Sequence, residues 1–242
     1  MIDPRVAAVE TRLEGVRRLL PVTGGKGGIG KSVVASLLAL VLAERGKRVG
    51  LLDLDLTGPC DHLILGIERG VPVEKFGVEP SLHDGVHFMS VSTFAGETPA
   101  PLRGDDLSNA LLEILAITQW GELDVLVLDL PPGLGDMALD AVRYIPRAEY
   151  IAVSTASRVV CETVRRNLKL LSELDVTIAG VVENMQRAPS DNVRDLAADF
   201  SLPFLGAIPF DDSLEAASGD RARLLETTVA ASLRLVGGQV LA

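Results

Sequence analysis

The sequence predicts an α/β protein with a doubly wound, mostly parallel sheet and helices on both faces. Short apolar runs alternate along the chain with helix-like stretches, which is typical of a parallel sheet. The runs are continuous rather than alternating with polar residues, so the strands are expected to be buried on both faces. Polar motifs follow several strand ends, where ligands of such sheets bind. We expect residues 1–242 to form one domain.

Seven strands and five helices are expected. The strands are Leu19–Thr23, Arg48–Asp53, Val86–Val91, Val125–Leu130, Tyr150–Ser154, Thr177–Val182 and Phe204–Ile208. The helices are Lys31–Arg45, Asp106–Thr118, Arg158–Leu174, Asp191–Phe200 and Arg221–Val236. Two stretches rich in glycine, proline and charge, Gly66–Gly85 and Thr93–Gly104, are expected to be surface loops.

Composition narrows the function classes. The formal net charge is -10, so no binding to nucleic acid is expected. The two cysteines lie far apart in sequence, which excludes a disulfide scaffold and favours a reducing cytoplasmic location. The first residues, Met1–Arg18, carry acids and do not resemble a signal peptide. Because no apolar run reaches the ~20 residues that span a bilayer, we expect no membrane anchor.

The strongest motif is a glycine-rich phosphate loop of the form G-x-x-x-x-G-K-S, between an expected strand and an expected helix. Its expected ligands of ATP are Gly25, Lys26, Gly27, Gly28, Ile29, Gly30, Lys31 and Ser32. Glycines let consecutive backbone N–H groups face phosphate oxygens, and the helix adds its positive dipole end. Lys31 is expected to reach the β- and γ-phosphates, and the Ser32 hydroxyl to coordinate Mg²⁺. For Lys26, a phosphate contact and a solvated charge remain open.

Three carboxylates follow expected strands. Asp53 and Asp55, at i and i+2, are expected to project together toward the ligand, where they hold Mg²⁺ or orient the attacking water. Asp129 ends another apolar strand, as a Walker-B acid does, so Mg²⁺ is expected on Ser32, Asp53 and Asp129. Gly133 follows two prolines and can offer its N–H to the γ-phosphate. Turn formation or helix capping by the aspartates is the structural alternative.

These motifs resemble those of the Mrp/ApbC-like ATPases, members of the MinD/ParA/nitrogenase-iron-protein class. The deviant Walker A carries the additional Lys26, the segment Asp53–Cys60 is similar to the D-x-D-x-x-G-P-S switch I, and Asp129–Gly133 is similar to the D-x-P-P-G switch II. Downstream, Gly180–Met185 and Phe204–Pro209 resemble the G-V-V-E-N-M and P-F-L-G-x-I-P segments. The resemblance covers roughly Arg18 to Asp220.

The resemblance implies roles for these residues. Lys26 would cross a dimer interface to the partner's nucleotide, and Asp55 or Asp53 would position the attacking water. Asn184 would hydrogen-bond the adenine, with the Pro209 region closing the base pocket. The catalytic set implied is Lys26, Lys31, Asp53, Asp55 and Asp129. Proteins of this family work as homodimers, or as heterodimers with a related ATPase, and are best known for carrying or assembling iron–sulfur clusters.

One difference from the family's motifs concerns the binding of an iron–sulfur cluster. Cluster-binding relatives place a C-x-x-C pair shortly after G-V-V-E-N-M, whereas Asn184–Asn192 holds no cysteine here. Because thiolates are the usual cluster ligands, no iron–sulfur cluster is expected on this chain alone. Cys60 replaces the family's serine, with His62 two residues on, so Cys60 is a speculative metal ligand. A small, partly buried side chain is the alternative for Cys60.

Three functions therefore compete. The leading hypothesis is a slow Mg-ATPase that acts as a dimeric nucleotide switch, accessory to iron–sulfur or other metallocofactor assembly and serving a client from that process. The second is a MinD/ParA-like positioning or partitioning ATPase that handles no metal. Arg221–Ala242 is cationic only at Arg221, Arg223 and Arg234, which disfavours a MinD-like membrane helix. The third is a module that binds nucleotide without hydrolysis, disfavoured by Lys31, Ser32, Asp55 and Asp129.

Overall fold

The computed structural model describes residues 3–56, 58–68, 73–93, 105–133, 135–145 and 147–242, and its centre is an eight-stranded sheet. The strand order is β10-β9-β8-β1-β7-β2-β6-β5, and every neighbouring pair is parallel except β6 with the edge strand β5. The strands of this sheet are β1 (Val16–Gly24), β2 (Val49–Asp53), β5 (Ser81–His83), β6 (Val86–Ser90), β7 (Leu123–Asp129), β8 (Glu149–Ser154), β9 (Thr177–Gln186) and β10 (Phe204–Pro209).

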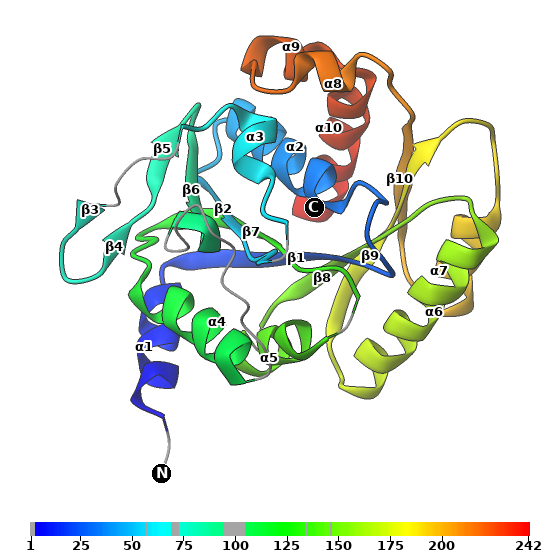
Figure 1. Cartoon of the computed structure of the whole chain (residues 1–242). Helices are drawn as coiled ribbons and strands as arrows, with labels where there is room; N and C mark the ends of the chain where they lie inside the picture. The colour runs from blue at the N-terminus through cyan, green and yellow to red at the C-terminus, as the bar shows by residue number, and fades with distance from the viewer. Residues whose placement is uncertain (1–2, 57, 69–72, 94–104, 134, 146) are drawn as a thin grey trace.

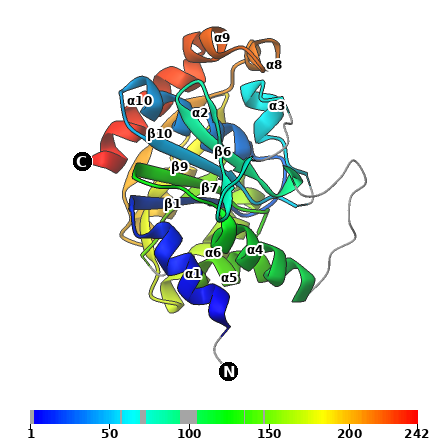
Figure 2. The same cartoon turned by 90° about the vertical axis from the view of Figure 1, so that its left-hand side faces the viewer.

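Helices cover both faces of the sheet (Figures 1 and 2). The helices are α1 (Pro4–Leu13), α2 (Lys31–Glu44), α3 (Asp61–Leu65), α4 (Asp105–Ile117), α5 (Asp136–Tyr144), α6 (Arg158–Glu173), α7 (Asn192–Asp199), α8 (Leu214–Ala217), α9 (Arg221–Glu226) and α10 (Thr228–Leu241). One apolar cluster contains α2, α10 and parts of α6 and α7, and a second contains α1, α4 and α5. The predicted doubly wound architecture is therefore confirmed.

All seven predicted strands are present. The central strands β2 and β7 show why the sequence reveals them: every residue of β2 is buried, and so is the stretch Val125–Asp129 of β7. A strand covered by helices on both faces needs apolar residues at successive positions, which produces a continuous run. β9 continues to Gln186, four residues beyond its predicted end, because Pro209 of β10 pairs with Gln186.

The prediction that Gly66–Gly85 is loop is wrong in part. This stretch contains β5 and the two strands of a small antiparallel sheet, β3 (Val73–Glu74) and β4 (Val78–Glu79). A turn at Asp84 and Gly85 returns β5 onto β6, and both residues have positive φ, 51° and 84°. An Asp-Gly pair is the preferred sequence for such a hairpin turn. Of the other expected loop, only Thr93, in a 3₁₀ turn at Val91–Thr93, lies within the described residues.

The C-terminal helix differs from its prediction. Instead of one helix over Arg221–Val236, α9 ends before Thr227, whose backbone is extended. The Thr227 side chain accepts a hydrogen bond from the Ala230 N–H at 3.1 Å and so begins α10. Threonine is a good N-cap residue, and this cap breaks an otherwise continuous helical pattern. No described helix has both the length and the apolar character needed to cross a membrane.

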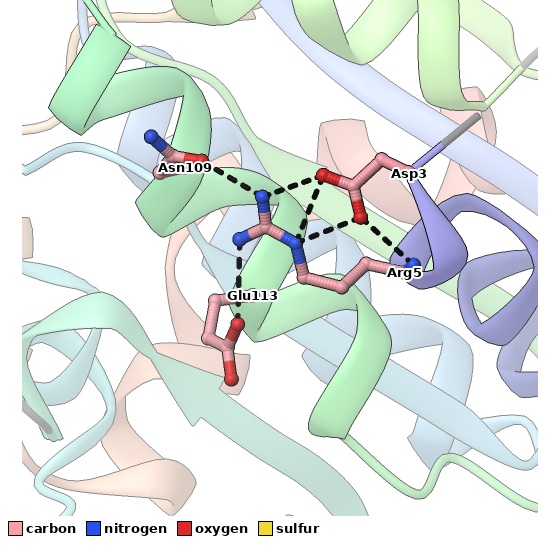
Figure 3. A network of polar contacts seen from close by, with 4 residues as sticks. All are labelled: Asp3, Arg5, Asn109 and Glu113. Carbon is pink, nitrogen blue, oxygen red and sulfur yellow. Dashed lines mark hydrogen bonds and ion pairs between the residues drawn. The ribbon is translucent and has the colours of Figure 1, made fainter. Parts of the chain in front are cut away.

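The first helix, α1, was not predicted, and a polar network fastens it to α4 (Figure 3). Asp3 caps α1 by accepting the Arg5 N–H at 2.9 Å. The Arg5 guanidinium donates to Asp3 at 2.7 Å, to Asn109 at 2.8 Å and to Glu113 at 3.5 Å. Val9 and Leu13 pack into the apolar cluster below the sheet. α1 is therefore held by tertiary contacts that no local pattern in the sequence displays.

Candidate functional site

The predicted phosphate loop and the predicted carboxylates lie around the C-terminal ends of β1, β2 and β7, three adjacent strands of the sheet, whereas Asn184 and Pro209 lie on β9 and β10. β1 ends at Gly24, a loop follows over residues 25–30, and α2 begins at Lys31. Gly28 and Gly30 have φ values of 80° and 77°, a left-handed conformation that costs a glycine little. The sequence thus folds locally as its motif predicts, with a tight turn from a strand end into a helix.

The loop has open space beside part of its glycine backbone. A Cβ atom added at Gly27 or Gly28 would meet no heavy atom within 4 Å, so the space beside their backbone is open. At Gly25 a Cβ would lie 2.9 Å from Thr163 on α6, which fixes the base of the loop against that helix. An open, glycine-lined turn at a helix N-terminus is a typical anion-binding site, so these residues fit nucleotide phosphates.

The two polar side chains at the start of α2 converge on one carboxylate. Lys31 Nζ donates to Asp129 Oδ1 at 2.5 Å, and Ser32 Oγ donates to Asp129 Oδ2 at 2.5 Å. Lys31 is 6% exposed and Asp129 is fully buried. Burial raises the pKa of Asp129, although Lys31 and Ser32 favour its charged form. The predicted lysine, hydroxyl and Walker-B acid therefore form one contact group.

Asp53 joins this group through the register of the sheet. Asp53 and Asp129 are direct partners across β2 and β7, so their side chains emerge at the same strand ends. Asp53 is fully buried, and burial together with the charge of Asp129 raises its pKa to about 7. Its Oδ2 atom has no hydrogen-bond partner among the described residues. A buried carboxylate oxygen without a partner is suited to a cation, so Asp53, Asp129 and Ser32 fit the predicted Mg²⁺.

A third carboxylate, Asp61, was missed by the sequence analysis. One carboxylate oxygen from each of Asp53, Asp61 and Asp129 lies within 4.8 Å of the others. Burial raises the pKa of Asp61 well above its usual value, and the charges of Asp129 and Asp53 raise it further. The sequence analysis expected neither a helix nor a site residue at this position, and the structure places Asp61 in the first turn of α3. Its burial depends on α2, where Ser36 donates to it at 2.8 Å.

Asp55 occupies a different position from Asp53. β2 ends at Asp53, and the backbone N–H of Asp55 donates to Asp53 Oδ1 at 3.0 Å, which turns the chain away from the strand. Asp55 is half-buried, and its Oδ1 accepts the Gly58 N–H at 3.2 Å. Because Asp55 lies beyond the end of the strand, the expectation that Asp53 and Asp55 project in the same direction, as alternate residues of one strand do, does not apply. Thr57, inside the predicted switch I segment, lies outside the described residues.

The remaining predicted ligands flank the loop. The Gly133 N–H, expected at the γ-phosphate, donates to Gly24 O at 3.0 Å. Asn184, expected at the adenine, is buried and donates from Nδ2 to Ile29 O at 2.8 Å and Gly30 O at 3.5 Å. Pro209 is half-buried at the end of β10, beside the end of β9. Both expected nucleotide donors thus bind backbone carbonyls of the loop region in this structure.

A groove of about 710 Å³ lies on the outer side of the loop, away from the carboxylates. Its lining comes from the loop, the start of α6 and the segment after β9. Two cationic side chains line it, those of the exposed Lys26 and of Arg187, and the Arg187 guanidinium lies 3.6 Å from the centre of the Phe210 ring. Arg187 occupies the stretch where the resembled family places its cysteine pair, and the sequence analysis did not single it out.

Neither cysteine belongs to the carboxylate group. Burial raises the pKa of the Cys60 thiol; a hydrogen bond with Ser32 lowers it, and the charges of Asp61, Asp53 and Asp129 raise it, so that the net effect favours the neutral thiol. Metal ligation by Cys60 stays a prediction, and a neutral thiol weighs against it. Cys161 is buried on α6 and its Sγ donates to Thr155 O at 3.3 Å, as expected for a packed side chain.

Comparison with protein families gives a match to ParA, described as a NUBPL iron-transfer P-loop NTPase, over residues 15–234. The chain is 35% identical to the iron-sulfur cluster carrier protein of Aquifex aeolicus over 222 residues, which is 83% of this chain and 59% of that protein. It is 38% identical over 178 residues to the protein of that name from Pseudomonas fragi, covering 72% and 62%. The chain thus spans about six tenths of these two relatives.

A relative of more similar length is the iron-sulfur cluster carrier protein of Saccharolobus solfataricus, 31% identical over 87% of this chain and 77% of its own. Among solved structures, a nucleotide-binding protein of Archaeoglobus fulgidus in complex with ADP matches with a TM-score of 0.76 and 30% identity, over 91% of this chain and 93% of that one. The cell division ATPase MinD of Pyrococcus furiosus matches with a TM-score of 0.70 and 21% identity, over 93% and 98%, which shows a shared fold.

Proposed function

Since the chain belongs to the ParA-type family of NUBPL iron-transfer P-loop NTPases, we propose that it is a slow Mg-ATPase that switches a dimer between nucleotide states in iron–sulfur cluster assembly. The observation that carries the ATPase part is the convergence of Lys31 and Ser32 on the buried Asp129. Phosphoryl transfer needs a lysine, a hydroxyl and an acid close together, and here the start of α2 supplies the first two within hydrogen-bond distance of the acid at the end of β7.

Each side chain has a distinct part in nucleotide binding. Lys31 leaves Asp129 for the β- and γ-phosphates, while the loop glycines offer backbone N–H groups beside open space. Ser32, Asp53 and Asp129 would hold Mg²⁺, which would supply charge neutralisation to the phosphate groups. The ADP complex of the Archaeoglobus relative supports a nucleotide ligand, and the preference for adenine rests on the role of Asn184 that the resemblance implies.

Hydrolysis requires a group that orients the attacking water, and Asp55 and Asp53 are the candidates. Asp55 is the better placed of the two because it is half-buried and lies past the strand end, where solvent reaches it. Asp53 is fully buried against Asp129 and is suited to the metal instead. We therefore assign water positioning to Asp55 and metal binding to Asp53.

The switching part of the proposal rests on Lys26 and Gly133. Lys26 is exposed at the groove, which leaves its ammonium group able to reach the nucleotide of a second protomer, either another copy or a related ATPase. Gly133 N–H is bound to Gly24 O, so engagement of a γ-phosphate requires this bond to break. Loss of the γ-phosphate lets the bond re-form, which couples the nucleotide state to the position of the segment.

The cargo part of the proposal follows from the relatives, which carry the name of iron-sulfur cluster carrier proteins. This chain has two cysteines, Cys60 and Cys161, and neither follows β9. We therefore propose an accessory role, in which the ATPase acts on a partner or client that supplies the thiolates for the cluster.

Phosphate release from Mg-ATP tests the catalytic part. We expect slow release by the wild-type chain and none above background by Lys31→Ala, with Lys47→Ala, which removes an exposed lysine after the other end of α2, as the control. Equal rates for Lys31→Ala and wild type would sink the assignment. Anaerobic reconstitution with iron and sulfide tests the cargo part: we expect no cluster on this chain alone, and a stable cluster would overturn the accessory role.

A positioning ATPase that handles no metal is the second candidate, supported by the fold shared with MinD. This chain has few of the exposed cationic residues with which MinD-like and ParA-like proteins bind membranes or DNA. The one cation of α10, Arg234, is engaged with Glu44 at 2.7 Å, and the net charge is -10. Binding to anionic lipid vesicles or to DNA in the presence of Mg-ATP would favour this candidate over cluster assembly.

A further inference from the structure

Asp61 is a buried acid with one free oxygen beside the proposed magnesium site. It begins α3, immediately after the segment that resembles switch I, and it is fully buried. Ser36 on α2 donates to Oδ1 at 2.8 Å, which fixes the carboxylate in place. The other oxygen, Oδ2, is buried and has no hydrogen-bond partner among the described residues. Desolvating a carboxylate oxygen without a partner is unfavourable, so such an atom indicates a missing ligand.

Asp53 presents the same feature from the neighbouring strand end. Its Oδ1 accepts the Asp55 N–H, and its buried Oδ2 has no partner in the described part of the chain. Asp129 differs, since each of its oxygens already accepts one hydrogen bond, from Lys31 or from Ser32, and has one further lone pair for a cation. The cluster therefore brings together three carboxylates and one ammonium group, and two carboxylate oxygens remain unsatisfied. With all three acids ionised, the excess is two negative charges, the charge of one divalent cation.

We propose that Asp61 is a third protein ligand of the divalent cation, and that Asp53, Asp61 and Asp129 bind this cation before any nucleotide arrives. The inference rests on the proposed function, because it concerns the metal site of the same ATPase. One oxygen from each acid already lies within 4.8 Å of the others. Two oxygen ligands of an octahedral Mg²⁺ are about 3.0 Å apart when adjacent and about 4.2 Å apart when opposite, so side-chain shifts on the order of 1 Å bring the three oxygens onto one cation.

The donor set defines the chemical class of the cation. The three carboxylates and the Ser32 hydroxyl supply oxygen alone, which is preferred by hard cations such as Mg²⁺ and Mn²⁺. Cys60 is not among the three residues of the cluster, so no thiolate draws a soft metal to it. A cation loaded in advance also neutralises the repulsion that the buried acids exert on a nucleotide triphosphate.

Mn²⁺ binding to the full chain tests the proposal. The protein is stripped of nucleotide and metal, and bound Mn²⁺ is measured from the loss of the free-ion electron paramagnetic resonance signal, with Mg²⁺ as competitor. We expect one Mn²⁺ per chain in wild type and at least ~10-fold weaker binding in Asp61→Asn, since even the loss of a group that only supports a ligand weakens metal binding about 10-fold or more. Asn keeps the acceptor for Ser36, and Mn²⁺ is expected to raise the melting temperature of wild type but not of this variant.

Asp124→Asn is the matched control, because it removes a carboxylate from the opposite end of β7, and it is expected to bind Mn²⁺ as wild type does. Equal Mn²⁺ affinity in Asp61→Asn and wild type would overturn the proposal. So would the absence of Mn²⁺ binding to wild-type protein that still binds Mg-ADP, a result that leaves the proposed ATPase intact. If wild-type protein bound neither Mn²⁺ nor Mg-ADP, the result would overturn both the role of Asp61 and the proposed ATPase function.

Discussion

Lys31 Nζ lies 2.5 Å from Asp129 Oδ1, and both side chains are buried. The lysine expected at the nucleotide phosphates is thus paired with an internal carboxylate that stands where a phosphate oxygen would compete. The same carboxylate accepts the Ser32 hydroxyl. In the proposed function, nucleotide binding exchanges the Lys31–Asp129 contact for contacts with phosphate, so the loss of this ion pair reduces the net free energy of binding.

Removing the ammonium group should leave Asp129 buried without its cation. We expect Lys31→Ala to lower the free energy of unfolding by about 3 kcal/mol near neutral pH, as in other broken buried pairs. The double variant Lys31→Ala/Asp129→Asn should recover much of this loss, since the uncompensated charge is gone. Urea denaturation of wild type, Lys31→Ala, Asp129→Asn and the double variant gives the coupling free energy between the two side chains. No recovery in the double variant would contradict a stabilising role for the pair.

The buried acids should make the nucleotide-free protein less stable as pH rises. The folded-state pKa of Asp53 is raised to about 7 from an ordinary value near 3.8, so between these values the folded chain holds a proton that the unfolded chain releases. The raised pKa therefore contributes to the free energy of unfolding. This contribution is fully present below about pH 4, is lost as pH rises through about 7, and amounts at most to the order of 4 kcal/mol.

Comparing Asp53→Asn with wild type isolates this effect from other titrating groups. Without Mg²⁺ and nucleotide, we expect the stability advantage of Asp53→Asn over wild type to grow between about pH 5 and pH 8. The midpoint of urea denaturation at several pH values measures it. An advantage independent of pH would show that Asp53 does not titrate in this range.

Gly133 should tolerate a side chain poorly for conformational rather than steric reasons. Its φ is 80°, yet a Cβ atom there would meet nothing within 4 Å. We expect Gly133→Ala to lose about 1 kcal/mol of stability from the left-handed backbone and to slow ATP hydrolysis. Gly58→Ala is the control for stability, because its Cβ also meets open space and its φ is not positive. Equal stability loss in the two variants would refute the conformational explanation.

Lys26 should matter for assembly and not for the fold of one protomer. Its side chain is exposed, so we expect Lys26→Ala to keep the wild-type melting temperature without nucleotide. Light scattering should show a dimer of wild type with Mg-ATP, a monomer with ADP, and no ATP-dependent dimer of Lys26→Ala. Lys47→Ala serves again as the exposed-lysine control. An unchanged dimer in Lys26→Ala would remove the cross-interface role.

The sequence predicted those parts of the structure in which the place of a residue in the fold dictates its residue type. The phosphate loop needs glycines at fixed offsets, and the strands buried on both faces need continuous apolar runs, so both were predictable. β5 escaped because it is three residues long, although Asp84-Gly85 carried a hairpin signal that was not used. α1 escaped because its stability comes from α4 through the Arg5 network.

Asp61 shows where sequence reasoning on one chain ends. The acids Asp53 and Asp129 were predictable because each ends an apolar strand, and parallel strand ends meet at one edge of the sheet. Asp61 begins a five-residue helix, where an acid is ordinarily solvated. Only the packing of that helix against α2, with Ser36 facing the carboxylate, takes Asp61 out of water.

The hydrogen bond from Asn184 to the Ile29 carbonyl connects the residue proposed to bind the base with the loop proposed to bind the phosphates. The Asn184 amide nitrogen donates to the carbonyls of both Ile29 and Gly30, so an adenine ring that accepts one of its two hydrogens weakens this tether of the loop. Pyrophosphate, which has no base, should then leave the tether in place, whereas ADP should weaken it. Hydrogen exchange at residues 25–30 with each ligand distinguishes the two, and identical protection would show that the base sends no signal to the loop.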